Sequence, residues 1–130
     1  MHADSAEETV TRLTSPPISV PKAMLLALDL IIVQYRNRRL GYRRTLQMAE
    51  VTSDGHASLL AQHEARQDKL KILGKPKNLI KKLQLFTGAT ESEIKKELKE
   101  KEKVLHYLVT SKINGLEEVG KVIADYYAKQ

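Results

Sequence analysis

Four consecutive apolar residues at positions 30–33 (Leu, Ile, Ile, Val) constrain the fold more than any other feature of this sequence. They would place apolar side chains on both faces of an extended chain, so they predict a strand covered on both sides. An arginine-rich segment follows, in which Gly41 can adopt the positive φ of a tight connection. Residues 45–51 permit a second strand. The sequence therefore predicts a β-hairpin with a basic tip.

Two short helices are predicted before this hairpin. Ser5 and Glu8 have the spacing of a capping box, and apolar residues recur behind them at helical spacing. Pro16 and Pro17 end this first helix. Pro21 suits the first position of a second, short helix.

The last third of the chain predicts three amphipathic helices joined by short turns. Pro76 marks the start of the first helix, Thr90 and Glu93 form a capping box for the second, and Gly115 precedes the third. We expect the apolar stripes of these helices to be buried against one another. The stripes consist of Leu79, Ile80, Leu83 and Phe86; of Ile94, Leu98, Leu105 and Leu108; and of Leu116, Val119, Ile123 and Tyr126.

Length and composition narrow the fold class. The chain has 130 residues, of which 42% are hydrophobic and 29% charged, so it has the size of one globular domain and no room for a two-domain enzyme. Residues 57–73 fit either a helix or strands, and their local pattern does not decide between them. We expect an α+β fold with two short N-terminal helices, a small, mostly antiparallel sheet and a C-terminal three-helix bundle.

The sequence lacks the residue patterns of several kinds of catalytic and binding site. The absence of cysteine excludes disulfide scaffolds, thiol catalysis and cysteine-ligated zinc. No segment matches the phosphate-binding pattern G-x-x-x-x-G-K-[ST] or the G-x-S-x-G turn of hydrolases. The four histidines are scattered without metal-ligand spacing, so we expect no metal site. The longest apolar run, at residues 23–33, contains an aspartate and is too short for a membrane span.

Two basic clusters remain as candidate binding features. The first contains Arg36, Arg38, Arg39, Arg43 and Arg44 and includes no acidic residue, and the second is a lysine-rich stretch at residues 69–82. Arginines interleaved with tyrosines can bind phosphates and stack on bases. The plainer interpretation is a solvated hairpin tip and a solubilising helix face.

Three separated blocks of sequence resemble one known family, in the family's order. The first looks like the histidine box of secretion ATPases, the second like the stretch after that box in archaeal type II/IV secretion ATPases, and the third like that family's C-terminal helices. The first block is His2-Ala3-Asp4-Ser5-Ala6-Glu7-Glu8 with Arg12-Leu13 and Pro16-Pro17. The second is Val20-Pro21, Ala27-Leu28-Asp29, Ile31-Ile32-Val33-Gln34 and Ala49-Glu50-Val51. The third includes Gly88-Ala89-Thr90, Val104-Leu105-His106-Tyr107-Leu108 and residues 118–127.

The resemblance implies a hexameric RecA-like motor that hydrolyses ATP to drive pilus or archaellum assembly, or secretion, at the inner face of the membrane. This chain would be the C-terminal end of such a protein. ATP and magnesium would be bound by the parent through Walker A and Walker B segments that the chain lacks, so the chain alone is expected to be inactive and to need no cofactor. The resemblance also implies strands within residues 58–73.

The resemblance assigns roles to individual residues. His2 matches the box histidine, which senses the γ-phosphate side of the nucleotide, and Asp4, Ser5 and Arg12 match residues near the nucleotide. For Asp4 and Ser5, capping of the first helix is an equally open interpretation, and for Arg12 a surface ion pair is. We expect the five hairpin arginines to contact a neighbouring subunit of a homo-hexamer or another partner.

The same resemblance suggests how the chain is organised. Residues 1–73 would be the tail of the motor domain, which carries the basic hairpin. Residues 74–130 would be a helical bundle that packs on the motor core or meets the membrane platform protein.

A small nucleic-acid-binding module is the alternative. The formal net charge of +6 and the basic hairpin, used as a wing, favour it. The last predicted helix argues against this alternative, because it begins with Glu117 and Glu118 and has no array of Arg, Asn or Gln to read base edges.

Overall fold

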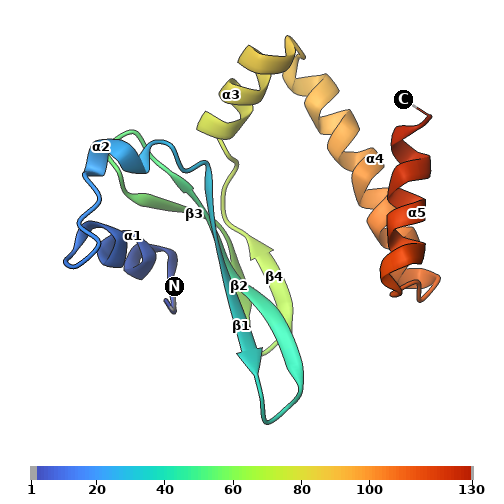
Figure 1. Cartoon of the computed structure of the whole chain (residues 1–130), viewed down its shortest axis with the longest axis horizontal. Helices are drawn as coiled ribbons and strands as arrows, with labels where there is room; N and C mark the ends of the chain where they lie inside the picture. The colour runs from blue at the N-terminus through green and yellow to red at the C-terminus, as the bar shows by residue number, and fades with distance from the viewer. Residues whose placement is uncertain (1–2, 130) are drawn as a thin grey trace. The chain divides into compact units, whose positions relative to one another are not determined.

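The structure, a computed structural model, describes residues 3–129 and forms two compact units, Met1–Lys82 and Leu83–Gln130. The division falls within a helix, nine residues after the predicted domain boundary. The predicted α+β class is confirmed, with a four-stranded antiparallel sheet and five helices among the described residues (Figure 1). The elements are α1 (Ala6–Thr14), α2 (Lys22–Leu25), β1 (Leu30–Asn37), β2 (Tyr42–Val51), β3 (Ala57–Glu64), β4 (Lys69–Ile72), α3 (Asn78–Thr87), α4 (Glu91–Thr110) and α5 (Leu116–Tyr127).

The start of α1 is capped as the sequence predicts, with one difference. The Ser5 hydroxyl accepts a hydrogen bond from the Glu8 N–H at 3.0 Å. The Glu8 carboxylate, however, accepts from the Asp4 N–H at 2.6 Å instead of from the Ser5 N–H. The pKa of Glu8 is lowered by this bond, and further by its ion pair with Arg12.

The sheet has the order β1-β2-β3-β4, with antiparallel neighbours throughout. Two bulges interrupt its register. Leu46 is an extra residue of β2 opposite β1, and Leu60 is an extra residue of β3 opposite β2. Outside these bulges, paired residues share a face of the sheet.

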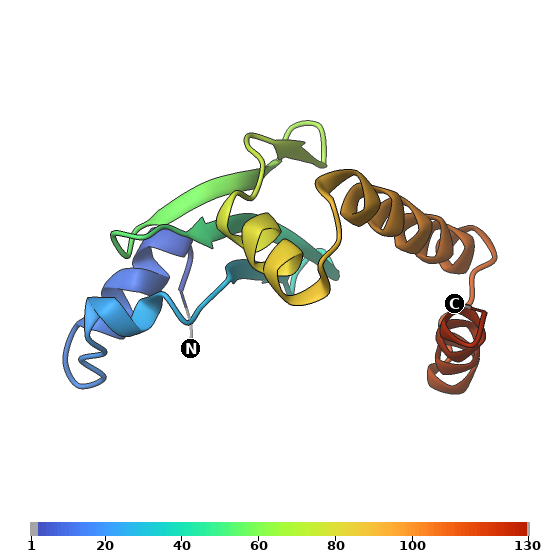
Figure 2. The ribbon, with the colours of Figure 1, turned by 90° about the horizontal axis from the view of Figure 1, so that it is seen from above.

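One face of the sheet forms the core of the first unit. Helices α1 and α2 lie side by side on the same flank of the sheet in both views (Figures 1 and 2). Seven buried apolar residues meet there: Ala6, Val10, Leu25, Ile31, Val33, Ala49 and Val51. They come from two helices and two strands, so burying them joins the N-terminal helices to the hairpin.

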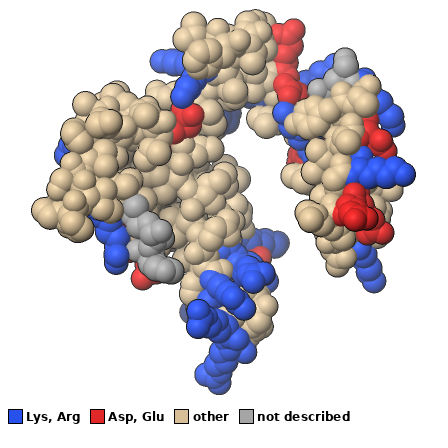
Figure 3. All heavy atoms as spheres, in the orientation of Figure 1, with Lys and Arg blue, Asp and Glu red and all other residues tan. Residues whose placement is uncertain are grey.

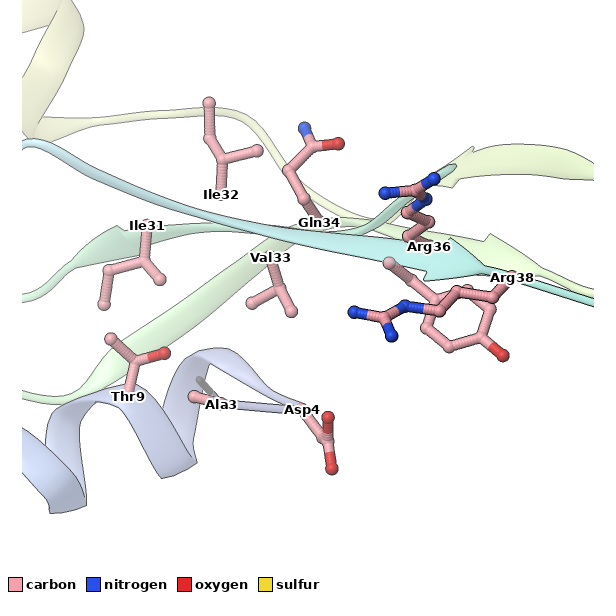
Figure 4. Close-up of a pocket in the computed structure, with 10 residues that line it drawn as sticks. Ala3, Asp4, Thr9, Ile31, Ile32, Val33, Gln34, Arg36 and Arg38 are labelled. Carbon is pink, nitrogen blue, oxygen red and sulfur yellow. The ribbon is translucent and has the colours of Figure 1, made fainter. Parts of the chain in front are cut away.

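The expectation that residues 30–33 are covered on both sides is wrong for the described chain. Ile31 and Val33 point toward α1 and are buried, whereas Ile32 points to the other face and is 51% exposed (Figure 4). Met48, which pairs with Ile32, is half-buried on that second face. The strand is therefore packed on one face only.

Residues 57–73 form strands, as the resemblance implied. Strands β3 and β4 pair from Ala61 and Ile72 to Glu64 and Lys69. Every residue of β4 is exposed. Little core packing supports this strand, and its place depends on backbone pairing with β3.

The start of α3 is attached to the sheet by a buried carboxylate. Glu50, which is 4% exposed, accepts hydrogen bonds from the N–H groups of Lys77 at 3.0 Å and Leu79 at 2.7 Å. The Asn78 amide donates to the Val51 carbonyl at 3.3 Å. Glu50 thus satisfies N–H donors at a helix start, where the helix itself supplies no acceptor. The helix begins two residues after Pro76, later than predicted.

In the second unit, α4 and α5 form a helical hairpin. The predicted capping box of Thr90 and Glu93 is confirmed. Among the apolar residues of these two helices only Ile94 and Leu108 are buried. The expected mutual burial of the stripes is therefore wrong at several positions, because Leu98, Leu105, Leu116, Ile123 and Phe86 are all exposed.

In the part of the chain that the structure describes, no helix is long and apolar enough to cross a bilayer.

Candidate functional site

The tip of the β1–β2 hairpin is a four-residue connection at positions 38–41. The Asn37 side-chain oxygen accepts a hydrogen bond from the Leu40 N–H at 2.9 Å, which closes the turn. Gly41 has a φ of +71°, as its predicted role requires. Local turn chemistry therefore holds the arginines at the end of a two-stranded projection.

Arg36 and Arg43 lie directly opposite each other in the pairing of β1 with β2. Like charges at such a position destabilise a sheet. None of the four arginines Arg36, Arg38, Arg39 and Arg43 has an ion-pair partner among residues 3–129. Figure 3 shows basic side chains gathered at the end of the hairpin. We call these four residues the tip arginines. Their arrangement costs stability within the chain, which is typical of a binding surface.

Arg44 differs from the tip arginines because its side chain has partners within the chain. Its guanidinium donates two hydrogen bonds to the Asp68 carboxylate, each of 2.6 Å, and lies 4.7 Å from the centre of the Tyr42 ring. His63 Nε2 lies 3.0 Å from the same carboxylate. The bond to Asp68 raises the pKa of Arg44. Arg44 thus links the β1–β2 hairpin to the β3–β4 turn, and its charge is already paired.

A hollow of about 600 Å³ lies beside β1, with Ala3, Asp4 and Thr9 on its other side. Its lining changes from apolar to basic along the strand. Ile31 and Val33 lie at the apolar end, and Arg36 and Arg38 lie at the basic end (Figure 4). Asp4 lines the same hollow. The structure therefore brings one of the residues matched to the histidine box and two of the tip arginines to one place.

The other residues matched to the box have local partners. The Ser5 hydroxyl caps α1, and Arg12 forms an exposed ion pair with Glu8, with a nitrogen–oxygen distance of 2.7 Å. These contacts fit the local interpretations of both residues. His2 lies outside the described residues.

The net charge of the chain is confined to its first unit. Residues 1–82 contain fourteen Lys and Arg against eight Asp and Glu, whereas residues 83–130 contain eight of each. In the lysine-rich stretch, Lys82 binds Asp29 at 2.8 Å. The tip arginines are four unpaired charges within eight residues of sequence, so among the described residues they form a concentrated attraction for an anionic partner.

Within residues 3–129, no three His, Asp or Glu side chains are gathered in a way that could hold a metal ion. The His63–Asp68 pair is the nearest approach to a catalytic arrangement in this region, but Arg44 occupies the carboxylate. Sequence reasoning missed this network and the buried Glu50. Their partners are five or more residues away, and no local pattern marks them.

Comparison with known proteins gives two archaeal relatives. The chain is 37% identical over 137 aligned positions to the uncharacterized protein MJ0781 of Methanocaldococcus jannaschii, and 31% identical over 134 positions to the uncharacterized protein MJ1287 of the same organism. Each alignment includes 97% of the chain, but only 18% of MJ0781 and 49% of MJ1287. The chain thus spans about a fifth of one relative and about half of the other. No protein-family model matches it.

Proposed function

We propose that this chain is the non-catalytic C-terminal region of a hexameric motor ATPase for archaeal secretion or pilus assembly. In this proposal the rest of the motor binds ATP and magnesium, and the tip arginines contact an acidic surface of a neighbouring subunit. The assembled motor works at the inner face of the membrane against a platform protein. The sequence blocks that resemble this family support the proposal, and so does the greater length of both archaeal relatives.

The open edge of β1 is the structural observation that carries the proposal. β1 is the first strand of the sheet and is eight residues long, with four consecutive apolar residues and no proline. Natural proteins usually protect such an edge with charge, proline or a covering element, and the one charged residue of β1, Arg36, lies near its end and away from the apolar run. An edge of this kind is well suited to pair with a further strand of a larger sheet. The exposed Ile32 on the adjacent face fits the same explanation.

The hollow beside β1 places basic groups next to that edge. Arg36 and Arg38 lie at one end of it, and Asp4 lies below the middle of the strand (Figure 4). A strand added along β1 would therefore pass Asp4 and reach the tip arginines. Guanidinium groups in such a place suit carboxylates or phosphates at a subunit boundary.

The first experiment is to read the coding DNA upstream of Met1 for an in-frame G-x-x-x-x-G-K-[ST] segment. If the segment is present, Arg36→Glu with Arg43→Glu in the full-length protein should weaken hexamer formation or stimulated ATP turnover by about tenfold or more. Arg66→Glu is the matched control, because Arg66 is exposed in the same unit and has no ion pair among the described residues. A missing segment, or unchanged assembly and turnover in the double variant, would refute the proposal.

Nucleic-acid binding is the second candidate, favoured by the concentration of unpaired charge at the tip. The aromatic part of that surface is less available, because Arg44 covers the Tyr42 ring and Tyr35 lies against it with a centroid distance of 6.5 Å. A salt-dependent shift of short single-stranded or duplex DNA, lost when the tip arginines become Gln, would favour this candidate over the motor.

A further inference from the structure

The helical hairpin of α4 and α5 has one apolar face that nothing in its own unit covers. Six exposed residues form it: Leu98, Leu105 and Val109 from α4, and Leu116, Ile123 and Tyr127 from α5. In each helix the three residues are spaced i, i+7 and i+11, which places them on one side. We call this surface the hairpin's apolar face.

Contacts between the helices show that the two triplets lie on the same side of the hairpin. Lys101 of α4 reaches to 6.0 Å from the centre of the Tyr127 ring of α5, so these two residues meet on that side. The opposite side is a separate hollow with a mixed lining that includes Glu100, Lys103 and Asp125. The hairpin is therefore amphipathic as a whole, with one mixed side and one apolar side.

Too little apolar surface is buried within this unit for a stable isolated hairpin. Ile94 and Leu108 are the only buried apolar residues of α4 and α5. A unit of this size normally needs a larger core, a cross-link or association. Leu116 is 91% exposed although it begins a helix with a regular apolar stripe.

We propose that the apolar face binds a second copy of this hairpin, so that two chains form an antiparallel four-helix bundle. Two-fold packing of helical hairpins is a common way to bury such faces. This pairing is independent of the motor proposal, because it uses only the second unit.

The charges of this unit suit association with itself. Residues 83–130 carry eight acidic and eight basic side chains. Along α4, acidic and basic residues form ion pairs one helical turn apart, such as Glu97 with Lys101 at 2.6 Å. Helix α5 begins with Glu117 and Glu118, and Lys129 follows its end. An antiparallel copy brings these opposite ends together. The first unit, which carries the whole net charge of +6, offers no such match to itself.

Small residues beside the apolar face favour a helix as the occupant. Gly120, Ala124 and Ala128 follow one another at four-residue spacing and are exposed. A Cβ added to Gly120 would meet no atom within 4 Å, so nothing in the single chain requires glycine there. Glycine inside a helix lowers its stability relative to alanine. Close approach of a second helix would explain its presence.

The test is sedimentation equilibrium of the full chain over about a hundredfold concentration range, on the wild type and three variants. Leu98→Gln changes the apolar face, and Tyr107→Gln is its matched control, because both residues are 54% exposed on α4 while Tyr107 lines the opposite side. Gly120→Gln adds a good helix former where the single chain has space.

We expect a wild-type dimer whose dissociation constant rises about tenfold or more in Leu98→Gln and Gly120→Gln but changes little in Tyr107→Gln. Helicity measured by circular dichroism should be unchanged or higher in Gly120→Gln, which separates loss of association from loss of folding. A wild type that is monomeric throughout the range would overturn the proposal. So would a dimer that all three variants weaken equally, or that none of them weakens.

Discussion

At the scale of single residues, the Asp68 carboxylate contacts two titratable side chains, those of Arg44 and His63. Its carboxylate accepts both hydrogen bonds from Arg44 and lies within hydrogen-bond distance of His63. The Arg44 guanidinium, and after it the His63 ring, hold the pKa of Asp68 far below its ordinary value. The folded chain therefore binds a proton at Asp68 less readily than the unfolded chain does.

The lower pKa of Asp68 in the folded chain predicts how the stability of the protein changes at acidic pH. Because the pKa is lower in the folded state, the contribution of Asp68 is complete above the unfolded value of about 4 and is lost as the pH falls toward the folded value. In Asp68→Asn, the melting temperature should fall relative to wild type at pH 6. The two proteins should converge as the pH is lowered from 4 toward 2. Thermal unfolding followed by circular dichroism at several pH values measures this.

Asp125→Asn is the control for the removal of a carboxylate charge, because Asp125 is exposed and its side chain has no hydrogen bond or ion pair among residues 3–129. Its melting temperature should follow wild type at every pH. Asp68→Asn and wild type differing by a constant amount down to pH 2 would contradict the assignment.

At the scale of elements, the buried carboxylate of Glu50 joins α3 to the sheet. Glu50→Gln keeps the size of the side chain but leaves one carbonyl oxygen for the N–H groups of Lys77 and Leu79. We expect the free energy of unfolding to fall by about 2 kcal/mol, because one of these two part-buried donors loses its charged partner. Urea unfolding followed by circular dichroism measures the change, with an unaltered m-value.

Glu64→Gln is the matched control, since Glu64 is half-buried on β3 and its carboxylate accepts one long hydrogen bond, of 3.4 Å, from the Gln67 amide. Its midpoint should stay close to that of wild type. Equal losses in both variants would mean that Glu50 acts through general charge and not through the start of α3. Faster hydrogen exchange at residues 77–81 in Glu50→Gln alone would support the local explanation.

The elements differ in how far the sequence predicts them. The starts of α1 and α4 are predictable because Ser5 and Thr90 act on N–H groups three residues away. Strands β3 and β4 are not, because residues 57–73 satisfy two periodicities and only pairing between distant segments decides between them. The stripe of α5 predicts a buried face, but no residue of this helix is buried, and Leu116 and Ile123 are exposed because no further element covers them in their own unit.

The candidate site was predicted in part. The arginines and the glycine of the hairpin stand together in the sequence, so a basic tip is foreseeable. The separate role of Arg44 depends on Asp68, which is 24 residues away, and no local signal marks that pair.

At the scale of the whole molecule, the position of charge matters more than its total. Replacing the tip arginines with Gln removes four positive charges from the unit that holds the whole excess. We expect the variant to elute from a heparin column at a clearly lower salt concentration, because unpaired, clustered charges release the most counterions.

Replacing Lys95, Lys96, Lys99 and Lys103 with Gln removes the same charge from α4, where acidic residues alternate with basic ones. The shift in elution should then be roughly half as large or smaller, because neighbouring carboxylates already weaken the field of these lysines. Equal shifts in the two variants would show that net charge alone controls retention.

The two bulges determine where the sheet can change in length. Elsewhere in β2 or β3, deleting one residue would turn every later side chain to the opposite face. Leu46 and Leu60 are the residues that the pairing skips, so their deletion would leave all other partners on their present faces. At Leu46 the cost would be the apolar contacts of one leucine, and at Leu60 it would also include the hydrogen bonds that the Leu60 carbonyl accepts from the N–H groups of Leu73 and Gly74. Natural variants of this chain that are one residue shorter in these strands are therefore expected to lose it at one of these two positions.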